Sequence, residues 1–235
     1  MNRFETFSNQ HLVTLAIGGI ATLALLLMGR MHGKWRKVST ALLAFFNLAA
    51  YPLSQAAWQT TGMKTNLDNL IPFHLCDIAS ITAGFALLTR RPLLMALTYY
   101  WGLAATIQAL ATPALETAFP SWLFVMFFIQ HFIIVAAALH MPMVEGWRPE
   151  KPFFKSPFQA YLWSLGYLLT ALGVNHLLGT NFGFANRPPE NPSLIDYLGP
   201  WPWYLLSFNV LCFALFSLLT LPFLGRLRKN PQIAN

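Results

Sequence analysis

Charged residues are scarce in this chain. Only 10% of its 235 residues are Asp, Glu, Lys or Arg, whereas about 25% is usual for a soluble domain. Acidic residues are the rarer kind, with 8 Asp and Glu against 15 Lys and Arg. This composition argues against a soluble domain, and a hydrophobic content of 56% points to a membrane protein.

Cysteine is scarce too. The two cysteines, Cys76 and Cys212, both lie inside apolar runs. They form neither the disulfide framework of a small secreted domain nor a zinc-binding spacing. A bond between Cys76 and Cys212 stays open at this stage. Residues 1–10 are polar, and no small-residue cleavage site follows the first apolar run, so no cleavable signal peptide is expected.

Long apolar runs, by contrast, recur from one end of the chain to the other. Each is about 20 residues long and therefore about 30 Å long as a helix, which matches the hydrocarbon core of a bilayer. We predict an all-α membrane protein with one polytopic domain, residues 1–235, and seven transmembrane helices. The predicted spans are residues 11–28, 39–58, 70–89, 93–111, 121–139, 158–178 and 203–224.

The basic residues are distributed unevenly between the loops. The loops after the first, third and fifth spans and the C-terminal tail hold twelve of the 15 Lys and Arg. Because Lys and Arg collect on the cytoplasmic side, we expect the N-terminus outside and the C-terminus in the cytoplasm. The formal net charge of +7 is then a topology signal, and no nucleic-acid partner is expected.

Polar residues gather at the start of the third predicted span, where His74, Cys76, Asp77 and Ser80 lie within seven positions. Such groups are costly in a bilayer, so they indicate a functional site that faces the protein interior. The structural alternative is a polar helix start near the interface. Pro72 suits the first turn of a helix, where its missing N–H costs nothing.

The rise of a helix places these side chains by depth. Cys76 lies about 5 Å outward of the midplane and His131 about at the midplane, a difference that helix tilt absorbs. Gln108 and Asn175 lie about 10 Å outward, and Asn209 about 5 Å outward. This clustering in the outer half suggests a cavity that opens to the outer side or the outer leaflet.

A thiol and an imidazole at compatible depths favour nucleophilic catalysis. The thiolate is the reactive form of cysteine, and a nearby base generates it. His131 is the best base for Cys76 from another span. On a regular helix His74 points away from Cys76, but it can contribute if the helix starts late. Asp77 is spaced to orient His74.

Amide side chains are candidates for stabilising an oxyanion. These amides are Gln108, Asn175, Asn181 and Asn209. Each candidate residue also has a structural alternative, because a polar side chain inside a span often makes a hydrogen bond between helices. For Cys212 we adopt the structural interpretation, since cysteine is a common buried residue.

A metal site is a further alternative. His74, Asp77 and His131 are three possible ligands, but their spacing matches no metal-binding signature. We therefore predict no metal and no cofactor.

Several stretches together resemble a known family. They are Leu70-Ile71-Pro72-Phe73-His74-Leu75-Cys76, a mid-span His131, the segment from Asn175 to Asn181, and Leu198-Gly199-Pro200-Trp201-Pro202-Trp203. They resemble the YwaF-like family of bacterial integral membrane proteins, whose animal relative is transmembrane protein 164. The resemblance runs from about the second span to the last.

The animal relative is described as a cysteine-dependent acyltransferase that remodels ether phospholipids. The resemblance implies Cys76 as the acyl-accepting nucleophile, His131 as its base, and a membrane phospholipid or lysophospholipid as partner. It also implies a multi-pass protein of the bacterial inner (cell) membrane. Two alternatives stay open: a lipid hydrolase with the same residues, and a non-enzymatic lipid or small-molecule binder.

Overall fold

The computed structural model describes residues 3–62 and 64–227. Within these ranges the named elements are all helices, and Arg3 and Thr117 form an isolated β bridge. The elements in chain order are α1 (Asn9–Arg30), α2 (Lys34–Gln59), α3 (Leu67–Leu70), α4 (Leu75–Thr89), α5 (Pro92–Ala111), α6 (Trp122–Met143), α7 (Lys155–Leu178), η1 (Phe182–Phe184), η2 (Leu194–Tyr197), α8 (Trp203–Thr220) and η3 (Leu221–Phe223).

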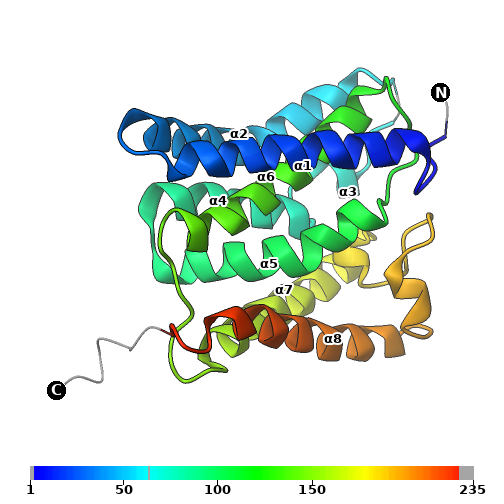
Figure 1. Cartoon of the computed structure of the whole chain (residues 1–235). Helices are drawn as coiled ribbons and strands as arrows, with labels where there is room; N and C mark the ends of the chain where they lie inside the picture. Colours follow the sequence, from blue (N-terminus) through cyan, green and yellow to red (C-terminus); the bar gives the residue numbers. More distant parts are fainter. Residues whose placement is uncertain (1–2, 63, 228–235) are drawn as a thin grey trace.

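Helices α1, α2, α4, α5 and α6 pack into one bundle (Figure 1). In it α5 contacts α4 and α6, and α2 contacts the same two helices. The pair α7 and α8 contacts the bundle mainly through α5. Because α4 and α6 each run antiparallel to α5, they run parallel to each other (Figure 1).

Local residues account for several helix ends. Ser8 caps α1 by accepting a hydrogen bond from the His11 N–H, and Ser121 caps α6 by accepting one from the Leu123 N–H. Gly179 ends α7 with a φ of 69°, a left-handed conformation that glycine adopts at low cost.

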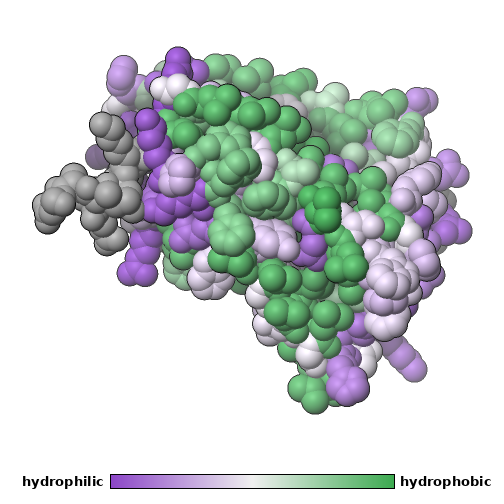
Figure 2. All heavy atoms as spheres, turned by 90° about the horizontal axis from the view of Figure 1, so that it is seen from below, coloured by the Kyte–Doolittle hydropathy of each residue, from purple (hydrophilic) through white to green (hydrophobic). Residues whose placement is uncertain are grey.

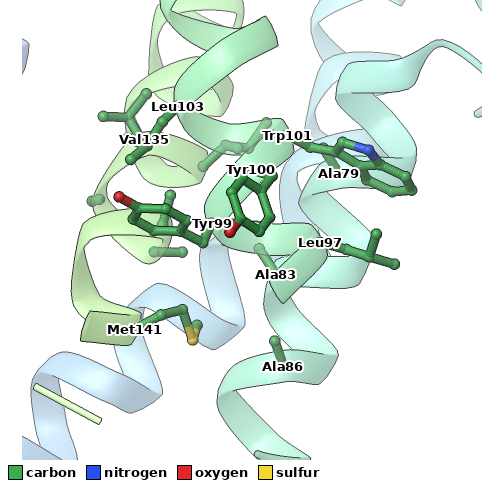
Figure 3. Close-up of a cluster of buried hydrophobic side chains, with 14 of the residues drawn as sticks. Ala79, Ala83, Ala86, Leu97, Tyr99, Tyr100, Trp101, Leu103, Val135 and Met141 are labelled. Atoms are coloured by element: carbon green, nitrogen blue, oxygen red, sulfur yellow. The ribbon is translucent and has the colours of Figure 1, made fainter. Parts of the chain in front are cut away.

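Small residues of α4 allow α5 to approach closely. Ala79, Ala83 and Ala86 recur every three or four residues and are at most 2% exposed. Figure 3 shows Ala79 and Ala83 beside Tyr100 and Trp101 of α5. Interfaces of this kind, with small residues against large ones, are typical of helices packed within a membrane.

Polar side chains also tie the bundle together. Asn47 of α2 donates from Nδ2 to the carbonyl oxygen of Ile133 in α6, at 3.1 Å. Ser80 of α4 donates from Oγ to the carbonyl oxygen of Asn47, at 2.7 Å. Polar groups in the second predicted span are thus satisfied by neighbouring helices, as a hydrocarbon environment requires.

Ion pairs join the start of α2 to the C-terminal ends of α4 and α6. The Glu145 carboxylate, whose side chain is 2% exposed, lies 2.9 Å from Arg90 Nε and 3.5 Å from Arg36 Nη2. His140 Nε2 lies 3.6 Å from the same carboxylate. The relative positions of α4 and α6 are therefore fixed at this end as well.

Among the described residues, five helices are long and apolar enough to cross a membrane. Three of them are α1, α5 and α6. The other two are the segments Leu67–Thr89, which contains α4, and Trp203–Phe223, which contains α8. Figure 2 shows a mainly hydrophobic face, with hydrophilic residues gathered toward its two ends. Helices α2 and α7 coincide with predicted spans but are less apolar. These findings support a multi-pass membrane protein, while the count of seven spans and the orientation stay predictions.

Candidate functional site

Helix α4 begins later than the apolar run predicts. The sequence predicts one helix over residues 70–89, whereas the structure has α3, a non-helical stretch, and then α4 from Leu75. Pro72 explains the break, because the residue before a proline is driven to extended backbone, and Ile71 has a φ of −101° and a ψ of 126°. His74 is also extended and forms the N-cap of α4. The prediction of a continuous helix is wrong at this end.

Cys76 is therefore the second residue of α4. Its thiol is free, as is that of Cys212, so the two cysteines are not bonded to each other. The first N–H groups of a helix have no intrahelical partner and carry partial positive charge. The His74 side chain does not cap them. Cys76 therefore lies at the positive end of the helix dipole.

His131 lies in the middle of α6 and is 3% exposed. Its Nδ1 lies 2.7 Å from the carbonyl oxygen of Phe127, and the two rings stack with centroids 4.1 Å apart. Because a carbonyl oxygen only accepts, Nδ1 carries the proton and Nε2 of the neutral ring has a free lone pair. That Nε2 is buried without a hydrogen-bond partner among the described residues. Trp58 Nε1, Thr117 Oγ1 and His140 Nδ1 are also buried without a partner in the described part of the chain. A neutral imidazole nitrogen with a free lone pair is the form that accepts a proton.

A hydrogen bond between α4 and α6 sets the relative heights of Cys76 and His131. Gln130 Nε2 donates to Asp77 Oδ1 at 2.9 Å. The two helices are parallel, Cys76 precedes Asp77 by one residue, and His131 follows Gln130 by one residue. With Asp77 and Gln130 taken at the same level, a rise of about 1.5 Å per residue puts Cys76 and His131 about 3 Å apart along the helix axes.

His74 lies just before α4, at its N-cap. Its ring meets the Phe182 ring edge-on, with 5.2 Å between centroids. The carboxylates of Asp77 and Asp68 lie in its electrostatic environment. Because His74 is outside the helix, the argument that a regular helix turns it away from Cys76 does not apply.

The amides of Asn175 and Asn181 build the loop that follows α7. Asn175 donates from Nδ2 to the Phe182 carbonyl oxygen (3.1 Å), and its Oδ1 accepts from Thr180 Oγ1 (2.9 Å) and the Phe182 N–H (2.7 Å). Asn181 donates from Nδ2 to the Arg187 carbonyl oxygen at 2.9 Å. Both amides are thus used within the loop.

Gln108 and Asn209 have separate surroundings. Asn209 donates from Nδ2 to the Leu205 carbonyl oxygen of its own helix, at 2.7 Å. Gln108 is half-buried near the end of α5, where its backbone carbonyl oxygen accepts from the Thr112 N–H at 2.9 Å. Across residues 3–62 and 64–227, no group of three His, Cys, Asp or Glu is placed to hold a metal ion, so the metal alternative gains no support.

Three residues near the candidate site are absent from the sequence-based set. Gln130 carries a signal in the sequence, because it is a polar residue in the middle of a predicted span. Asp68 accepts from the Asn181 N–H at 2.6 Å, and Tyr167 donates from Oη to the Phe73 carbonyl oxygen at 3.0 Å. For Asp68 and Tyr167 the partners are distant in the chain, so no local pattern reveals them.

The fold and the site together define a helical membrane protein with the Cys76 thiol on α4 and, on the neighbouring α6, a His131 nitrogen that has no partner among the described residues. The chain belongs to the TMEM164 family, whose model matches residues 6–220. This is the family to which the sequence motifs point, so that prediction is confirmed.

A relative from Treponema pallidum (strain Nichols), an uncharacterized protein, is 29% identical over 163 residues. The match covers 66% of this chain and 63% of the relative, so it spans less than two thirds of that protein. No solved structure matches the chain.

Proposed function

We propose that the protein is a membrane-embedded acyltransferase that remodels phospholipids, with Cys76 as nucleophile and His131 as base. The observation that carries this proposal is the buried Nε2 of His131, which has no partner in the described part of the chain and lies near the height of Cys76. The family and the bacterial relative support a location in the inner (cell) membrane of a bacterium.

The first half-reaction transfers an acyl group to the protein. The Sγ proton of Cys76 passes to Nε2 of His131, and the thiolate attacks the carbonyl carbon of a phospholipid ester. The bond between that carbon and the glycerol oxygen breaks, and the leaving oxygen takes the proton from His131. The products are a lysophospholipid and an acyl thioester on Cys76.

The second half-reaction regenerates the thiol. The hydroxyl of an acceptor lysophospholipid gives its proton to His131 Nε2, and its oxygen attacks the thioester carbonyl carbon. The C–S bond breaks, and the Cys76 thiolate regains the proton. A water molecule in place of the lysophospholipid makes the same site a lipid hydrolase, so water access to the thioester decides between the two outcomes.

The carbonyl oxygen becomes negatively charged in both half-reactions and needs hydrogen-bond donors. The N–H of Cys76 belongs to the first turn of α4, and the His74 side chain does not cap this helix end. Because the amides of Asn175 and Asn181 are used within their loop, we assign the oxyanion to this helix end and not to those amides.

The test is lipid turnover by the purified protein in vesicles of defined phospholipid with an isotopically labelled lysophospholipid. Mass spectrometry follows the products of the wild type, Cys76→Ala and His131→Ala. Cys212→Ala is the matched control, because Cys212 is also a half-buried free thiol. We expect labelled diacyl lipid from the wild type and the control, and none from the other two variants.

The other outcomes are equally informative. Free fatty acid without labelled diacyl product makes the protein a hydrolase with the same residues. Undiminished turnover by Cys76→Ala overturns the role of the thiol. If the wild type converts no lipid in vesicles of several lipid classes, the enzyme proposal fails and a lipid or small-molecule binder is favoured.

A further inference from the structure

Gln130 has a buried side chain, 6% exposed, that spans the interface between α6 and α4. It donates from Nε2 to a carboxylate oxygen of Asp77, at 2.9 Å. The two residues that this bond joins, Gln130 and Asp77, are the immediate chain neighbours of His131 and Cys76.

The bundle does not need this bond to bring α4 and α6 together. Asn47 already links the two helices, through Ser80 of α4 and Ile133 of α6. Glu145 joins α4 to the end of α6 through Arg90. A carboxylate within a membrane span is costly, and an apolar contact would hold the helices at lower cost.

We propose that Gln130 is a positioning residue that acts through Asp77 to hold Cys76 and His131 in register. This inference rests on the proposed function and extends it. The bond fixes the relative height of the two helices within one residue of each reacting side chain. The links through Asn47 and Glu145 hold the two helices together in its absence, and we expect loss of the bond to let the residues at this level move locally.

The first readout is kinetic. Gln130→Leu keeps the volume of the side chain roughly constant but donates no hydrogen bond. We expect kcat for acyl transfer to fall about 10- to 100-fold, because a shift of about 1 Å in the reacting groups has effects of that size. KM stays nearly unchanged, since Gln130 is not assigned any contact with the lipid. A merely structural role would leave kcat per folded molecule at the wild-type value.

Two variants keep this kinetic test decisive. The double variant Asp77→Gln, Gln130→Asp exchanges the two side chains between the helices. Because one amide and one carboxylate side chain again span the interface, we expect this variant to recover most of the lost kcat. Ser217→Ala is the matched control, because it removes a single hydrogen bond, to Phe213 within α8. It keeps wild-type kcat.

The second readout does not need enzymatic activity. His131→Cys in a Cys212→Ser background leaves two thiols, at positions 76 and 131, which a short bifunctional thiol reagent can join. We expect efficient cross-linking in this parent and a rate lower by about fivefold or more when Gln130→Leu is added.

The combined results separate the two proposals. Unchanged kcat and unchanged cross-linking in Gln130→Leu overturn the positioning role and leave the proposed function intact. A second outcome combines slower cross-linking after Gln130→Leu with undiminished lipid turnover by Cys76→Ala. It supports the positioning of the two side chains by Gln130 and overturns the proposed function. If the parent does not cross-link, the two side chains do not face each other and both proposals fail.

Discussion

A single imidazole nitrogen is the residue-level feature on which the proposed chemistry depends. The Phe127 carbonyl oxygen fixes the tautomer of His131, and burial keeps Nε2 without a partner in the described residues. An apolar side chain would fill the same space without an orphaned polar atom, which normally lowers stability. The proposed function gives this nitrogen a role, as the acceptor of the Cys76 proton.

The reactivity of Cys76 tests this role of His131. If Nε2 takes the thiol proton, His131→Ala lowers the rate of Cys76 alkylation by about tenfold or more, because general bases contribute at least this much. The measurement is the rate of maleimide addition in detergent, followed for each cysteine by mass spectrometry. Cys212 in the same molecules is the internal control and keeps its rate. Equal rates at Cys76 in both proteins would contradict the assignment.

Asn175 permits a second prediction at this scale. Its side chain makes three hydrogen bonds within the loop after α7, and leaving such groups unpaired costs about 1–3 kcal/mol. We expect Asn175→Ala to lower the free energy of unfolding by that amount, measured by denaturation in detergent. Asn209→Ala removes one bond inside its own helix and changes stability by about 0.5 kcal/mol or less. An Asn175→Ala protein with wild-type stability but no acyl transfer would instead indicate a catalytic amide.

At the scale of elements, the contact between α1 and α6 depends on one glycine. A Cβ atom on Gly18 would lie 2.1 Å from the Phe132 ring, whereas a Cβ atom on the adjacent Gly19 would meet nothing within 4 Å. Gly18 therefore leaves room for an aromatic ring of α6.

The two glycines give a matched pair of variants. Gly18→Ala forces the Phe132 ring to move, and overpacking of this kind costs about 1–3 kcal/mol. Gly19→Ala is expected to be neutral or slightly stabilising, because alanine is the better helix former. Thermal unfolding in detergent compares the two. Equal stability of both variants would show that α1 shifts freely against α6.

The positions of the long helices could be predicted from the sequence, because each apolar run has the length of a span. The start of α4 could not, since the hydropathy of residues 70–89 is continuous across the break at Pro72. The Asp77–Gln130 bond was also beyond prediction, because it depends on which helices are neighbours. The depths of Cys76 and His131 in a bilayer stay predictions, and the free Nε2 could not be predicted because it depends on local packing against Phe127.

At the scale of the whole molecule, the uneven distribution of basic residues makes the strongest remaining prediction. With the N-terminus outside, Lys64 faces the exterior and Lys37 the cytoplasm, and both side chains are exposed. In a Cys76→Ala, Cys212→Ala background, we expect Lys64→Cys to react with a membrane-impermeant maleimide in intact cells and Lys37→Cys to react only after permeabilisation. The reverse pattern would invert the topology and place the reactive end of α4 in the cytoplasm.

The acyl thioester on Cys76 is the species that distinguishes this protein from a binder and from an enzyme that does not use the thiol. The measurement is mass spectrometry of the intact protein after incubation with donor phospholipid and no lysophospholipid acceptor. We predict an acyl adduct on Cys76 that hydroxylamine removes, that persists in Cys212→Ala and that is absent from Cys76→Ala. Lipid turnover without any adduct on Cys76, or an adduct that survives Cys76→Ala, would contradict the mechanism.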